Sequence, residues 1–466
     1  MDKILYIIKK YIPVKLFKAL QPAYHFIFSW ISAAVYRWPS EKLIVIGVTG
    51  TTGKTTSVYL IAKMLTAVGY KVGYTSTAMF GDGKKEWLNN KKMTMPGRFF
   101  TQKILRDMAK NGCQYALVET TSEGIRQFRH RFINYDTLIF TGLYPEHIES
   151  HGSFANYKKA KGELFKHLKR CGVKYANNDK CICPSDSGFK KIELNRVKKT
   201  IIANGDDEEA GYFLSFWAEE KKAYTRNNNF KKDGVEAIKY SSIKSGGEGT
   251  SFSVVGEKIN LKILGEFNVA NAMTAVSVGL AERIDIKKIK IGLEKINGVP
   301  GRLERINEGQ KFTVLVDYAF EPKAVSKLYE AIKLISKDEK QKKNIIHVLG
   351  STGGGRDKAR RPHLGKIAGA KADYVIITNE DPYDDDPQEI INQVAEGAIE
   401  VGKKEGEDLF KILDRREAIH KALALAKEND IVLITGKGSE QAICVAEGEK
   451  IPWDDREVTK EELKKI

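Results

Sequence analysis

Residues 45–56 read Val-Ile-Gly-Val-Thr-Gly-Thr-Thr-Gly-Lys-Thr-Thr, an apolar run followed by a glycine-bearing loop and a Gly-Lys-Thr-Thr ending. This order predicts a buried strand over 43–48 and a helix over 55–65. A strand that passes to a helix through such a loop directs backbone N–H groups and a helix N-terminus at one point, which favours phosphate. Lys54 would add a positive charge for the terminal phosphates, and the Thr55 hydroxyl is a ligand suited to Mg²⁺.

The glycines of this loop depart from the strict Walker A spacing. That pattern needs glycine at position 48, where this chain has valine, and the glycines stand at 47, 50 and 53 instead. A simple glycine-rich turn before an amphipathic helix is the alternative, and the apolar strand and the Gly-Lys-Thr-Thr ending disfavour it. We therefore predict a phosphate site made of Gly50, Thr51, Thr52, Gly53, Lys54, Thr55 and Thr56.

Length and composition indicate a soluble globular protein with two or three domains. The chain has 466 residues, of which 42% are apolar and 29% charged, and its net charge is +17. Such a charge favours phosphate-rich substrates, an anionic membrane or nucleic acid. The cations are mostly lysines spread along the chain without an aromatic platform, which disfavours nucleic acid. Five cysteines without a C-x-x-C pair favour a reducing cytoplasm over a disulfide framework.

Residues 1–40 form a basic, apolar and helical N-terminal segment that differs from the rest of the chain. Lysines alternate with apolar residues through residue 20, and residues 24–36 are rich in Phe, Ile, Trp and Ala. Pro13 and Pro22 interrupt the pattern, and no unbroken apolar run reaches the ~20 residues of a spanning helix. Two interpretations stay open: contact with the inner face of a membrane, or helices that cover an apolar face of the next domain.

The remainder predicts two α/β domains. Alternating strands and helices over 41–298 indicate a doubly wound domain that contains the phosphate loop and a β-rich insertion at about 204–256. Val299-Pro-Gly-Arg302 is typical of a hinge, and 299–466 is expected to form a Rossmann-like α/β domain. Several of its strands end in polar residues, where ligands gather in open α/β sheets.

A carboxylate stands at the end of the strand predicted beside the phosphate loop. Glu119 follows Ala-Leu-Val and precedes three hydroxyl residues, so it can hold Mg²⁺ together with Thr55. A strand-ending Glu is by itself more often a solvated or capping residue, but this context reverses the balance. His147 and Lys161, considered singly, would more often be a structural hydrogen-bonding residue and a solvated helix residue.

An ordered set of motifs resembles the Mur ligase family of cell-wall peptide synthetases from about residue 42 to the C-terminus, and within it the MurE branch. The phosphate loop is similar to that family's Thr-Gly-Thr-Asn-Gly-Lys-Thr-Thr, with Thr52 in place of Asn. The other matching segments are 119–129, 140–152, 157–165, 265–271, 299–304, 317–322, 353–362, 436–440 and 453–457.

This resemblance implies an ATP-dependent amide ligase. It would add diaminopimelate, lysine or a similar diamino acid to a muramoyl dipeptide through an acyl phosphate. By resemblance, Lys54 would place a positive charge beside the transferring phosphoryl group. Thr55 and Glu119 would hold one Mg²⁺, and His147 and a carbamylated Lys161 would help to hold a second. A carbamate is a carboxylate-like oxygen ligand, which suits Mg²⁺.

The resemblance also implies the binding residues. Asn271 would contact adenine, and Arg302 and Asp317 would reach the nucleotide from the second domain. The substrate residues would be Thr94, Pro96, Thr121, Ser122, Gln127, Arg129, Arg356, Asp381, Pro382, Gly436 and Glu440. The expected protein is a monomer.

Some positions depart from the family's pattern. Tyr383 stands where diaminopimelate-adding members have an Arg, so lysine or another diamine becomes at least as plausible, because Tyr cannot replace a bidentate carboxylate partner. Phe320 and Glu123 each replace a His. About forty residues stand where the family has a nucleotide-binding domain, so the acceptor is expected to be either nucleotide-linked or lipid-linked.

Two other functions were weighed. One is another amide ligase of the superfamily, such as a folylpolyglutamate synthetase-like protein, and the segments 353–357 and 436–440 argue against it. The other is a P-loop switch or scaffold that only binds nucleotide. A switch would need neither Lys161 in its Tyr-x-x-Ala-Lys helix nor a second α/β domain.

Overall fold

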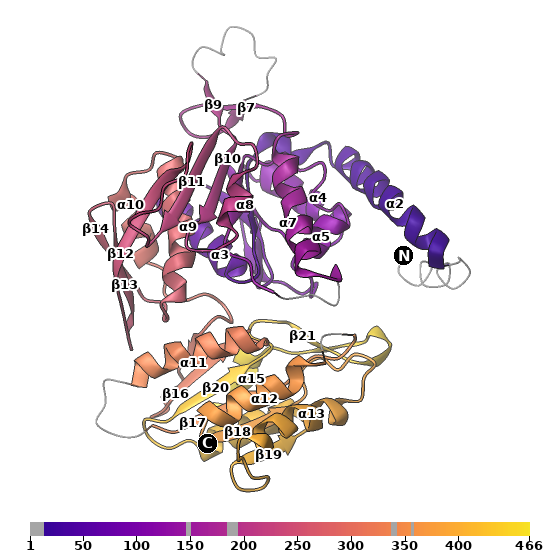
Figure 1. Cartoon of the computed structure of the whole chain (residues 1–466), viewed down its shortest axis with the longest axis vertical. Coiled ribbons are helices and arrows are strands. Elements are labelled where there is room, and N and C mark those ends of the chain that lie inside the picture. Colours follow the sequence, from indigo (N-terminus) through magenta and orange to yellow (C-terminus); the bar gives the residue numbers. More distant parts are fainter. Residues whose placement is uncertain (1–13, 146–150, 184–193, 337–342, 356–357) are drawn as a thin grey trace.

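The computed structural model describes residues 14–145, 151–183, 194–336, 343–355 and 358–466. Two large β-sheets dominate these residues, one of eleven strands and one of six, and they lie in two bodies, one above the other in Figure 1. Small sheets of three and two strands accompany them. The α/β class expected from the sequence is confirmed.

The larger sheet carries the phosphate loop at its centre. Its strand order is β14-β13-β12-β11-β10-β6-β1-β5-β2-β3-β4. The strands are β1 (Ile44–Thr49), β2 (Val72–Thr75), β3 (Met79–Gly81), β4 (Glu86–Leu88), β5 (Tyr115–Glu119), β6 (Thr137–Phe140), β10 (Thr200–Asn204), β11 (Glu220–Thr225), β12 (Glu236–Gly246), β13 (Gly249–Val254) and β14 (Glu257–Leu261). β1 is buried along its whole length and runs parallel to β5 and β6, as the apolar pattern predicted.

The β-rich segment expected at about 204–256 continues this sheet. β10 pairs parallel with β6, and β11 and β12 follow in parallel. β13 and β14 then pair antiparallel at the edge. The sheet is therefore mixed, with a parallel centre that holds the site and an antiparallel margin. A separate small sheet is formed by β7 (Lys174–Ala176), β8 (Ile182–Cys183) and β9 (Asn195–Val197).

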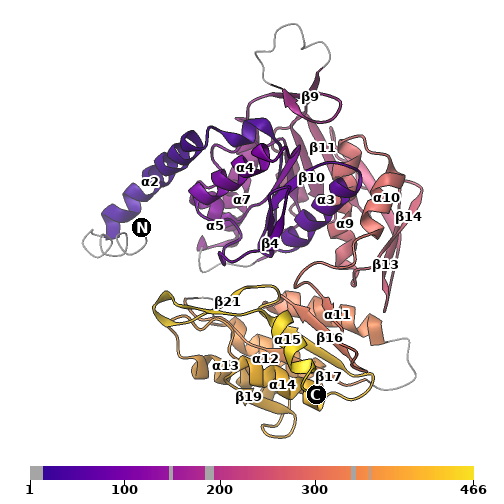
Figure 2. The ribbon, with the colours of Figure 1, turned by 180° about the vertical axis from the view of Figure 1, so that it is seen from behind.

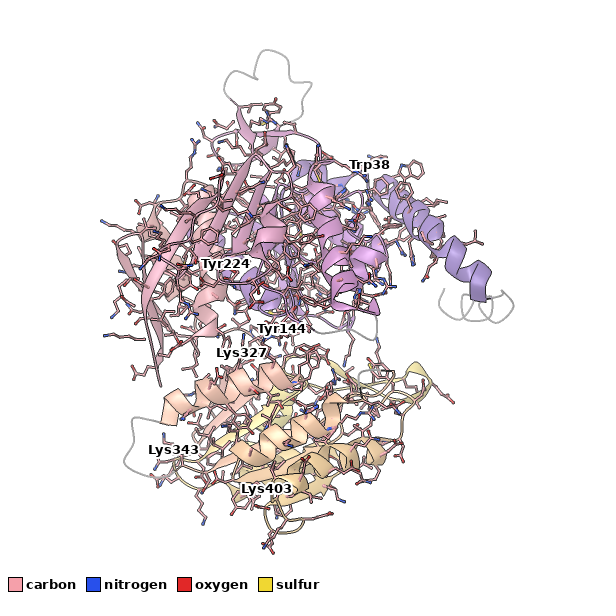
Figure 3. The ribbon with its side chains drawn as sticks, viewed as in Figure 1. Trp38, Tyr144, Tyr224, Lys327, Lys343 and Lys403 are labelled. Carbon is pink, nitrogen blue, oxygen red and sulfur yellow. The ribbon has the colours of Figure 1, made fainter. Side chains whose placement is uncertain are left out.

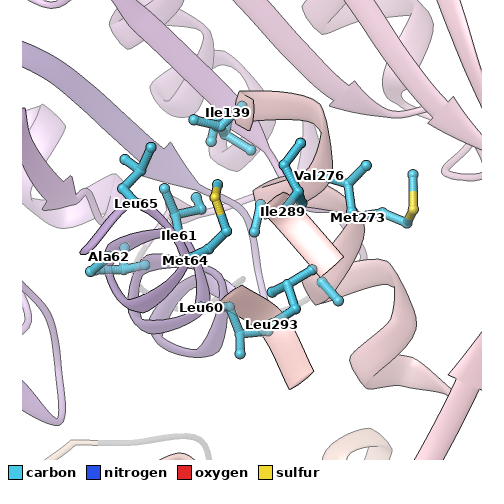
Figure 4. Close-up of a cluster of buried hydrophobic side chains, with 14 of the residues drawn as sticks. Leu60, Ile61, Ala62, Met64, Leu65, Ile139, Met273, Val276, Ile289 and Leu293 are labelled. Atoms are coloured by element: carbon cyan, nitrogen blue, oxygen red, sulfur yellow. The ribbon is translucent and has the colours of Figure 1, made fainter. Parts of the chain in front are cut away.

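Helices cover both faces of the larger sheet. On one face α3 (Lys54–Ala67), α9 (Phe267–Ala281) and α10 (Ile286–Glu294) form a buried apolar cluster. Figure 4 shows Ile61 and Met64 of α3 in this cluster, beside Ile289 and below Ile139 of the sheet. On the other face lie α4 (Arg98–Lys110), α5 (Ser122–Arg126), α7 (Phe154–Leu168) and α8 (Ala210–Leu214). Each fully buried aliphatic side chain contributes about 1.5–3 kcal/mol, so these clusters fix the position of the loop after β1.

The second body is built on the six-stranded sheet, with order β15-β16-β20-β17-β18-β19. The strands are β15 (Glu304–Ile306), β16 (Thr313–Asp317), β17 (Ile345–Leu349), β18 (Tyr374–Thr378), β19 (Leu409–Ile412) and β20 (Ile431–Thr435). On one face pack α11 (Pro322–Ser336), α12 (Arg360–Lys371) and α13 (Pro387–Glu400). On the other pack α14 (Arg415–Leu425) and α15 (Asp455–Leu463), visible from behind in Figure 2. A hairpin of β21 (Ala442–Cys444) and β22 (Lys450–Pro452) lies beyond β20.

The described part of the N-terminal segment, from residue 14, forms a long helix, α2 (Val14–Val35), followed by a short 3₁₀ helix, η1 (Pro39–Lys42). α2 runs along the outside of the central body, beyond α4 and α5 (Figures 1 and 2). Pro22 was expected to interrupt this pattern, but the helix continues through it. Pro22 is exposed, so the carbonyl that loses its N–H donor is open to hydration. Among the described residues, no helix is long and apolar enough to cross a membrane.

Candidate active site

A cavity of about 940 Å³ lies between the two bodies. Its lining comes from the loops after the carboxyl ends of β1, β5, β16, β18 and β20, so the carboxyl edges of both sheets face it. Tyr144 and Lys327 mark the level of this boundary in Figure 3. Most predicted site residues line it together: Thr51, Thr52, Gly53, Lys54, Thr55, Thr56, Thr94, Glu119, Thr121, Ser122, Gln127, Arg129, Asn271, Arg302, Asp317, Asp381, Gly436 and Glu440.

A few predicted residues lie elsewhere. Gly50, Pro96, Lys161 and Pro382 do not line the cavity, although each adjoins a residue or loop that does. His147 and Arg356 lie outside the described residues, so the positions predicted for them are not placed.

The phosphate loop takes backbone conformations that require glycine. Gly53 has φ +80°, and a Cβ there would collide with the side chain of Asn271. Gly53 is also the N-cap residue of α3, and no side chain caps the helix, so its first N–H groups face the cavity. Lys54 Nζ donates to the carbonyl of Thr51 over 2.7 Å. This end of α3 therefore presents N–H groups and a cation, as an anion requires.

Glu119 and Thr55 form a pair of oxygen ligands beside the loop. Thr55 Oγ1 donates to Glu119 Oε2 over 2.9 Å, and both side chains are buried. The other donors to Glu119 are the backbone N–H of Thr77 at 2.8 Å and its hydroxyl at 3.0 Å. A carboxylate and a hydroxyl at this spacing suit Mg²⁺, which accepts a few protein oxygens and phosphate oxygens. Within the described residues, no group of three His, Cys, Asp or Glu side chains forms a metal cluster.

Lys161 lies behind the phosphate loop on α7. It is 1% exposed, and its Nζ donates to the carbonyl of Gly50 over 2.8 Å. Burial lowers the pKa of Lys161 well below its usual value; Lys54 lowers it further, and Glu119 opposes this. The ring of Tyr157 lies 4.7 Å from Nζ. A lowered pKa favours the neutral amine, which is the form that reacts with CO₂.

The predicted nucleotide residues come from both bodies. Asn271 on α9 donates to Asn268 over 2.9 Å and lies against Gly53. Arg302 reaches from the second body to Thr55 Oγ1 at 3.4 Å and lies 4.3 Å from the ring centre of Tyr318. Asp317 accepts from the N–H groups of 303 and 319, at 2.7 and 2.6 Å, which fixes the loop that carries Arg302.

The predicted acceptor residues line the side of the cavity beyond Glu119. Thr94 and Thr77 share a hydrogen bond of 2.8 Å between their hydroxyls. Thr121 caps α5 by accepting from the N–H of Gly124. Arg129 donates to Gln127 Oε1 over 2.6 Å and to the carbonyl of Met95, the residue before Pro96.

Four buried charges join the two bodies at the far end of the cavity. Lys92, from the central body, contacts Asp381 and Glu440 at 2.7 Å each and donates to the carbonyl of Ala442 at 2.8 Å. Lys437 contacts the same two carboxylates at 2.8 Å. Burial alone would lower the pKa of Lys92, but the two carboxylates raise it. Sequence reasoning missed Lys92, because a loop lysine carries no local sign of a partner hundreds of residues away.

Glu380 contributes a third carboxylate to this end, beside Asp381 and Glu440. It is 2% exposed and lines the cavity, and its Oε2 has no hydrogen-bond partner among the residues that the structure describes. Burial and then the neighbouring Asp381 raise the pKa of Glu380 to about 7, against the opposing charge of Arg360. A buried carboxylate oxygen without a hydrogen-bond partner in a cavity can bind a cationic ligand.

The three substituted positions have clear surroundings. Phe320 lies 5.1 Å from the ring of Tyr318, and the guanidinium of Arg360 lies 5.4 Å over it. Glu123 accepts from Gln127 Nε2 over 2.7 Å. Tyr383 lines the cavity in a left-handed conformation, φ 52°.

Comparison with known proteins agrees with this geometry. The models of the Mur ligase middle domain and of the Mur ligase glutamate ligase domain match residues 48–279 and 301–438. The UDP-N-acetylmuramyl-tripeptide synthetase of Roseiflexus sp. is 35% identical over 431 residues, 91% of this chain and 79% of that protein. The chain belongs to the Mur ligase family. Membership makes it an enzyme, an ATP-dependent ligase that forms an amide bond.

This Mur ligase is also similar to two further proteins, one a sequence relative and one a solved structure. The UDP-N-acetylmuramoyl-L-alanyl-D-glutamate–2,6-diaminopimelate ligase 1 of Clostridium acetobutylicum is 32% identical, covering 94% of this chain and 81% of that protein. A solved structure of a ligase with the same activity in its title superimposes with a TM-score of 0.57 at 25% identity, over 91% of this chain and 79% of that one. The fold of this Mur ligase is therefore similar to that of its relatives.

Proposed function

We propose that this chain joins a diamino acid to the dipeptide of a muramoyl precursor in peptidoglycan synthesis, with ATP as the energy source. One observation carries the proposal: a single cavity holds the phosphate loop with its Thr55–Glu119 pair on one side and the Asp381–Glu440 cluster on the other. Relatives at 35% and 32% identity are named for this chemistry.

The residues divide the work of amide formation. Bound MgATP supplies a phosphoryl group that turns the acceptor carboxylate into an acyl phosphate, which the incoming amine then converts to an amide. Lys54 and the N-terminal end of α3 hold the transferring phosphoryl group by charge and N–H donors. Thr55 and Glu119 would hold Mg²⁺, while Asn271, Arg302 and Asp317 orient the nucleotide. Closure of the second body over the cavity excludes water.

A second Mg²⁺ and a carbamylated Lys161 are part of the proposal. Lys161 is buried beside the phosphate loop and points at Gly50 rather than at a carboxylate. Its carbamate would replace an amine by an oxygen ligand close to the γ-phosphate position. His147 would complete this site by the family resemblance, and it stands outside the described residues.

The amino acid is proposed to be lysine or a diamine of similar length. Glu380 offers an unpartnered carboxylate oxygen to the cavity, and Arg360 beside it supplies a cation for the α-carboxylate. Tyr383 is uncharged, so at this position it does not give a second carboxylate on the amino acid the cationic partner that an Arg would give. Diaminopimelate remains the competing substrate in the assay below.

The remaining features of the proposal concern the whole chain. Residues 41–298 and 299–466 act as separate domains around the hinge, and the protein works as a monomer with a peripheral membrane contact through residues 1–40. The acceptor dipeptide is carried on a uridine nucleotide or on a lipid. A folylpolyglutamate synthetase-like activity or a nucleotide switch is not favoured, because the identity to muramoyl-peptide ligases exceeds 30% across both domains.

Phosphate release is the test of this function. The purified chain, Mg²⁺ and ATP are incubated with a muramoyl dipeptide on either carrier and a panel of amino acids, with products read by mass spectrometry. We expect phosphate only when acceptor and amino acid are both present, with lysine as the best substrate. Phosphate release without either partner would favour a nucleotide switch and contradict the proposal.

A further inference from the structure

Helix α2 turns its polar side chains toward the protein, the reverse of an ordinary surface helix. Ser29 Oγ donates to the carbonyl of Phe128 over 3.0 Å, and Arg98 Nε donates to Ser29 Oγ over 3.1 Å. Arg98 also contacts His25. Ser32, one turn further along, is buried. The inward face of α2 is therefore held to the central body by hydrogen bonds, together with contacts of the Phe26 ring with Phe128 and Phe132.

The outward face of α2 is an apolar stripe. Leu20, Ile27, Trp30 and Val35 are 55%, 51%, 49% and 60% exposed, and their spacing of seven, three and five residues places them on one side of the helix. Residues 19–36 contain no Asp, Glu, Lys or Arg. This stripe is uncovered by any residue that the structure describes, so water would meet a continuous apolar surface.

Aromatic side chains at and after the C-terminal end of α2 are of the kind found at a membrane–water interface. Trp38 follows α2 and is 40% exposed; Figure 3 shows it at the outer edge of the molecule. Phe99 of α4 is 37% exposed, and its ring lies 6.5 Å from that of Tyr36. The guanidinium of Arg106, also on α4, lies 4.8 Å from the ring centre of Tyr36. Tryptophan and tyrosine with nearby arginine favour the depth of lipid headgroups.

Charge decides between a lipid surface and a second copy of the chain. Residues 3–40 contain Lys3, Lys9, Lys10, Lys15, Lys18 and Arg37, and no Asp or Glu. Two copies joined through α2 would bring these cations together, which opposes association. An anionic bilayer attracts the same cations while the stripe enters the headgroup region.

We propose that the outward face of α2, formed by Leu20, Ile27, Trp30 and Val35, docks on an anionic phospholipid membrane. The helix lies in the plane of the surface, with its polar face toward the enzyme. Arg98 couples it to the site, because its guanidinium also donates to the carbonyl of Gln127 over 2.9 Å and Gln127 lines the cavity. Docking thus holds the side of the cavity that is proposed to bind the acceptor dipeptide close to the bilayer. This last step rests on the proposed function.

Vesicle binding tests the docking surface without substrate or ATP. The full chain is sedimented with vesicles of phosphatidylcholine alone or mixed with phosphatidylglycerol. We expect binding to the mixed vesicles only, and Ile27→Glu is expected to weaken it about tenfold or more. Ile291→Glu is the matched control, because Ile291 on α10 is 52% exposed and the charge change is the same. That variant should bind like the wild type.

A second measurement locates the contact on α2. Tryptophan emission of the wild type should shift to the blue with mixed vesicles, and Trp30→Phe should reduce the shift. Circular dichroism of each variant confirms folding. Equal binding by the wild type and Ile27→Glu, or no binding by the wild type, would overturn the proposal.

Two further measurements distinguish a membrane from a second copy of the chain, and membrane docking from ligase activity. A lipid-free dimer in sedimentation equilibrium that Ile27→Glu abolishes would assign the stripe to a second copy, and so overturn membrane docking. Ligase activity on a soluble acceptor should be unchanged in Ile27→Glu. Failure of the wild type to bind mixed vesicles while its ligase activity is present therefore contradicts the docking surface, and absence of ligase activity while vesicle binding is present contradicts the proposed function.

Discussion

Lys161 differs from Lys92 in its lack of a carboxylate hydrogen-bond partner among the described residues. Its Nζ meets a carbonyl and an aromatic ring instead, in a buried position. Burial lowers the pKa of Lys161 and of Lys54, whereas Glu440 and Asp381 raise the pKa of Lys92 against its burial. The residue type is the same in all three cases, and the surroundings decide the direction in which the pKa moves.

Lys161→Ala tests the carbamate. We expect ligase activity to fall about a hundredfold or more, because an oxygen ligand near the transferring phosphoryl group is lost. Acetate or another short carboxylic acid should restore part of it by supplying the oxygen. Lys158→Ala on the same helix, whose Nζ pairs with Glu209 at 3.0 Å, shortens a lysine in the same way and should keep near-normal activity. Full activity of Lys161→Ala would refute the role.

Glu380 is expected to make the free energy of unfolding depend on pH. Its folded pKa of about 7 lies above the ordinary value of 4.5, so the folded state holds an extra proton between these values. The free energy of unfolding should therefore fall as pH rises from about 4.5 to 7, by about 1.4 kcal/mol per pH unit, and level off above. Urea unfolding of the wild type and Glu380→Gln across this range measures the difference. Parallel profiles for the two proteins would contradict the assignment.

At the scale of elements, α12 and α13 pack more closely than side chains normally allow. Gly365 on α12 faces the carbonyl of Val394, and Gly397 on α13 faces the carbonyl of Pro362. A Cβ at either glycine would collide with backbone. The absence of side chains at these crossing points therefore sets the distance between the helices, and with it the position of the loop before α12 at the cavity.

Gly397→Ala should destabilise the second body by about 1–3 kcal/mol, because the helices must separate to admit the methyl group. Gly211→Ala on α8 is the control. Its Cβ would meet only Lys232 Nζ at 3.6 Å, an ordinary contact, so stability should stay the same or rise slightly. Thermal unfolding of both variants gives the comparison; equal melting temperatures would disprove the close-packing argument.

On the scale of the whole molecule, contacts across the cavity hold the two bodies in one arrangement. Lys92 pairs with Asp381 and Glu440 at one end, and Lys323 of α11 lies 4.1 Å over the ring of Tyr144 at the other. The Lys92 side chain is 6% exposed, so its charge interactions are little screened by solvent. Lys92 thus connects domain closure to the end of the cavity where the amino acid is proposed to bind.

Lys92→Ala is expected to favour an open arrangement. Small-angle scattering should give a larger radius of gyration, and kcat should fall about tenfold or more because closure assembles the site. Lys91→Ala removes the same charge from an exposed neighbour, which only lies 5.7 Å over the ring of Phe100, and should behave like the wild type. An unchanged radius and rate in Lys92→Ala would show that closure does not depend on this contact.

The sequence by itself determined the local parts. The apolar run before Gly50 predicted β1, and the Ala-Leu-Val run before Glu119 predicted the strand β5 with Glu119 at its end. These predictions succeed because a buried parallel strand needs a continuous apolar run and a phosphate loop needs glycine at fixed positions. The order of motifs further indicated the family.

Only the tertiary structure decided the features that join distant residues. Lys92 and Asp381 are separated by 289 positions, and neither side chain carries a local sign of the other. Likewise, the sequence left open whether the apolar residues of α2 contact a membrane or cover the next domain, and the structure turns Ser29 inward and Ile27 outward. Local patterns report which residues share a face, but the packing of the whole chain determines what that face meets.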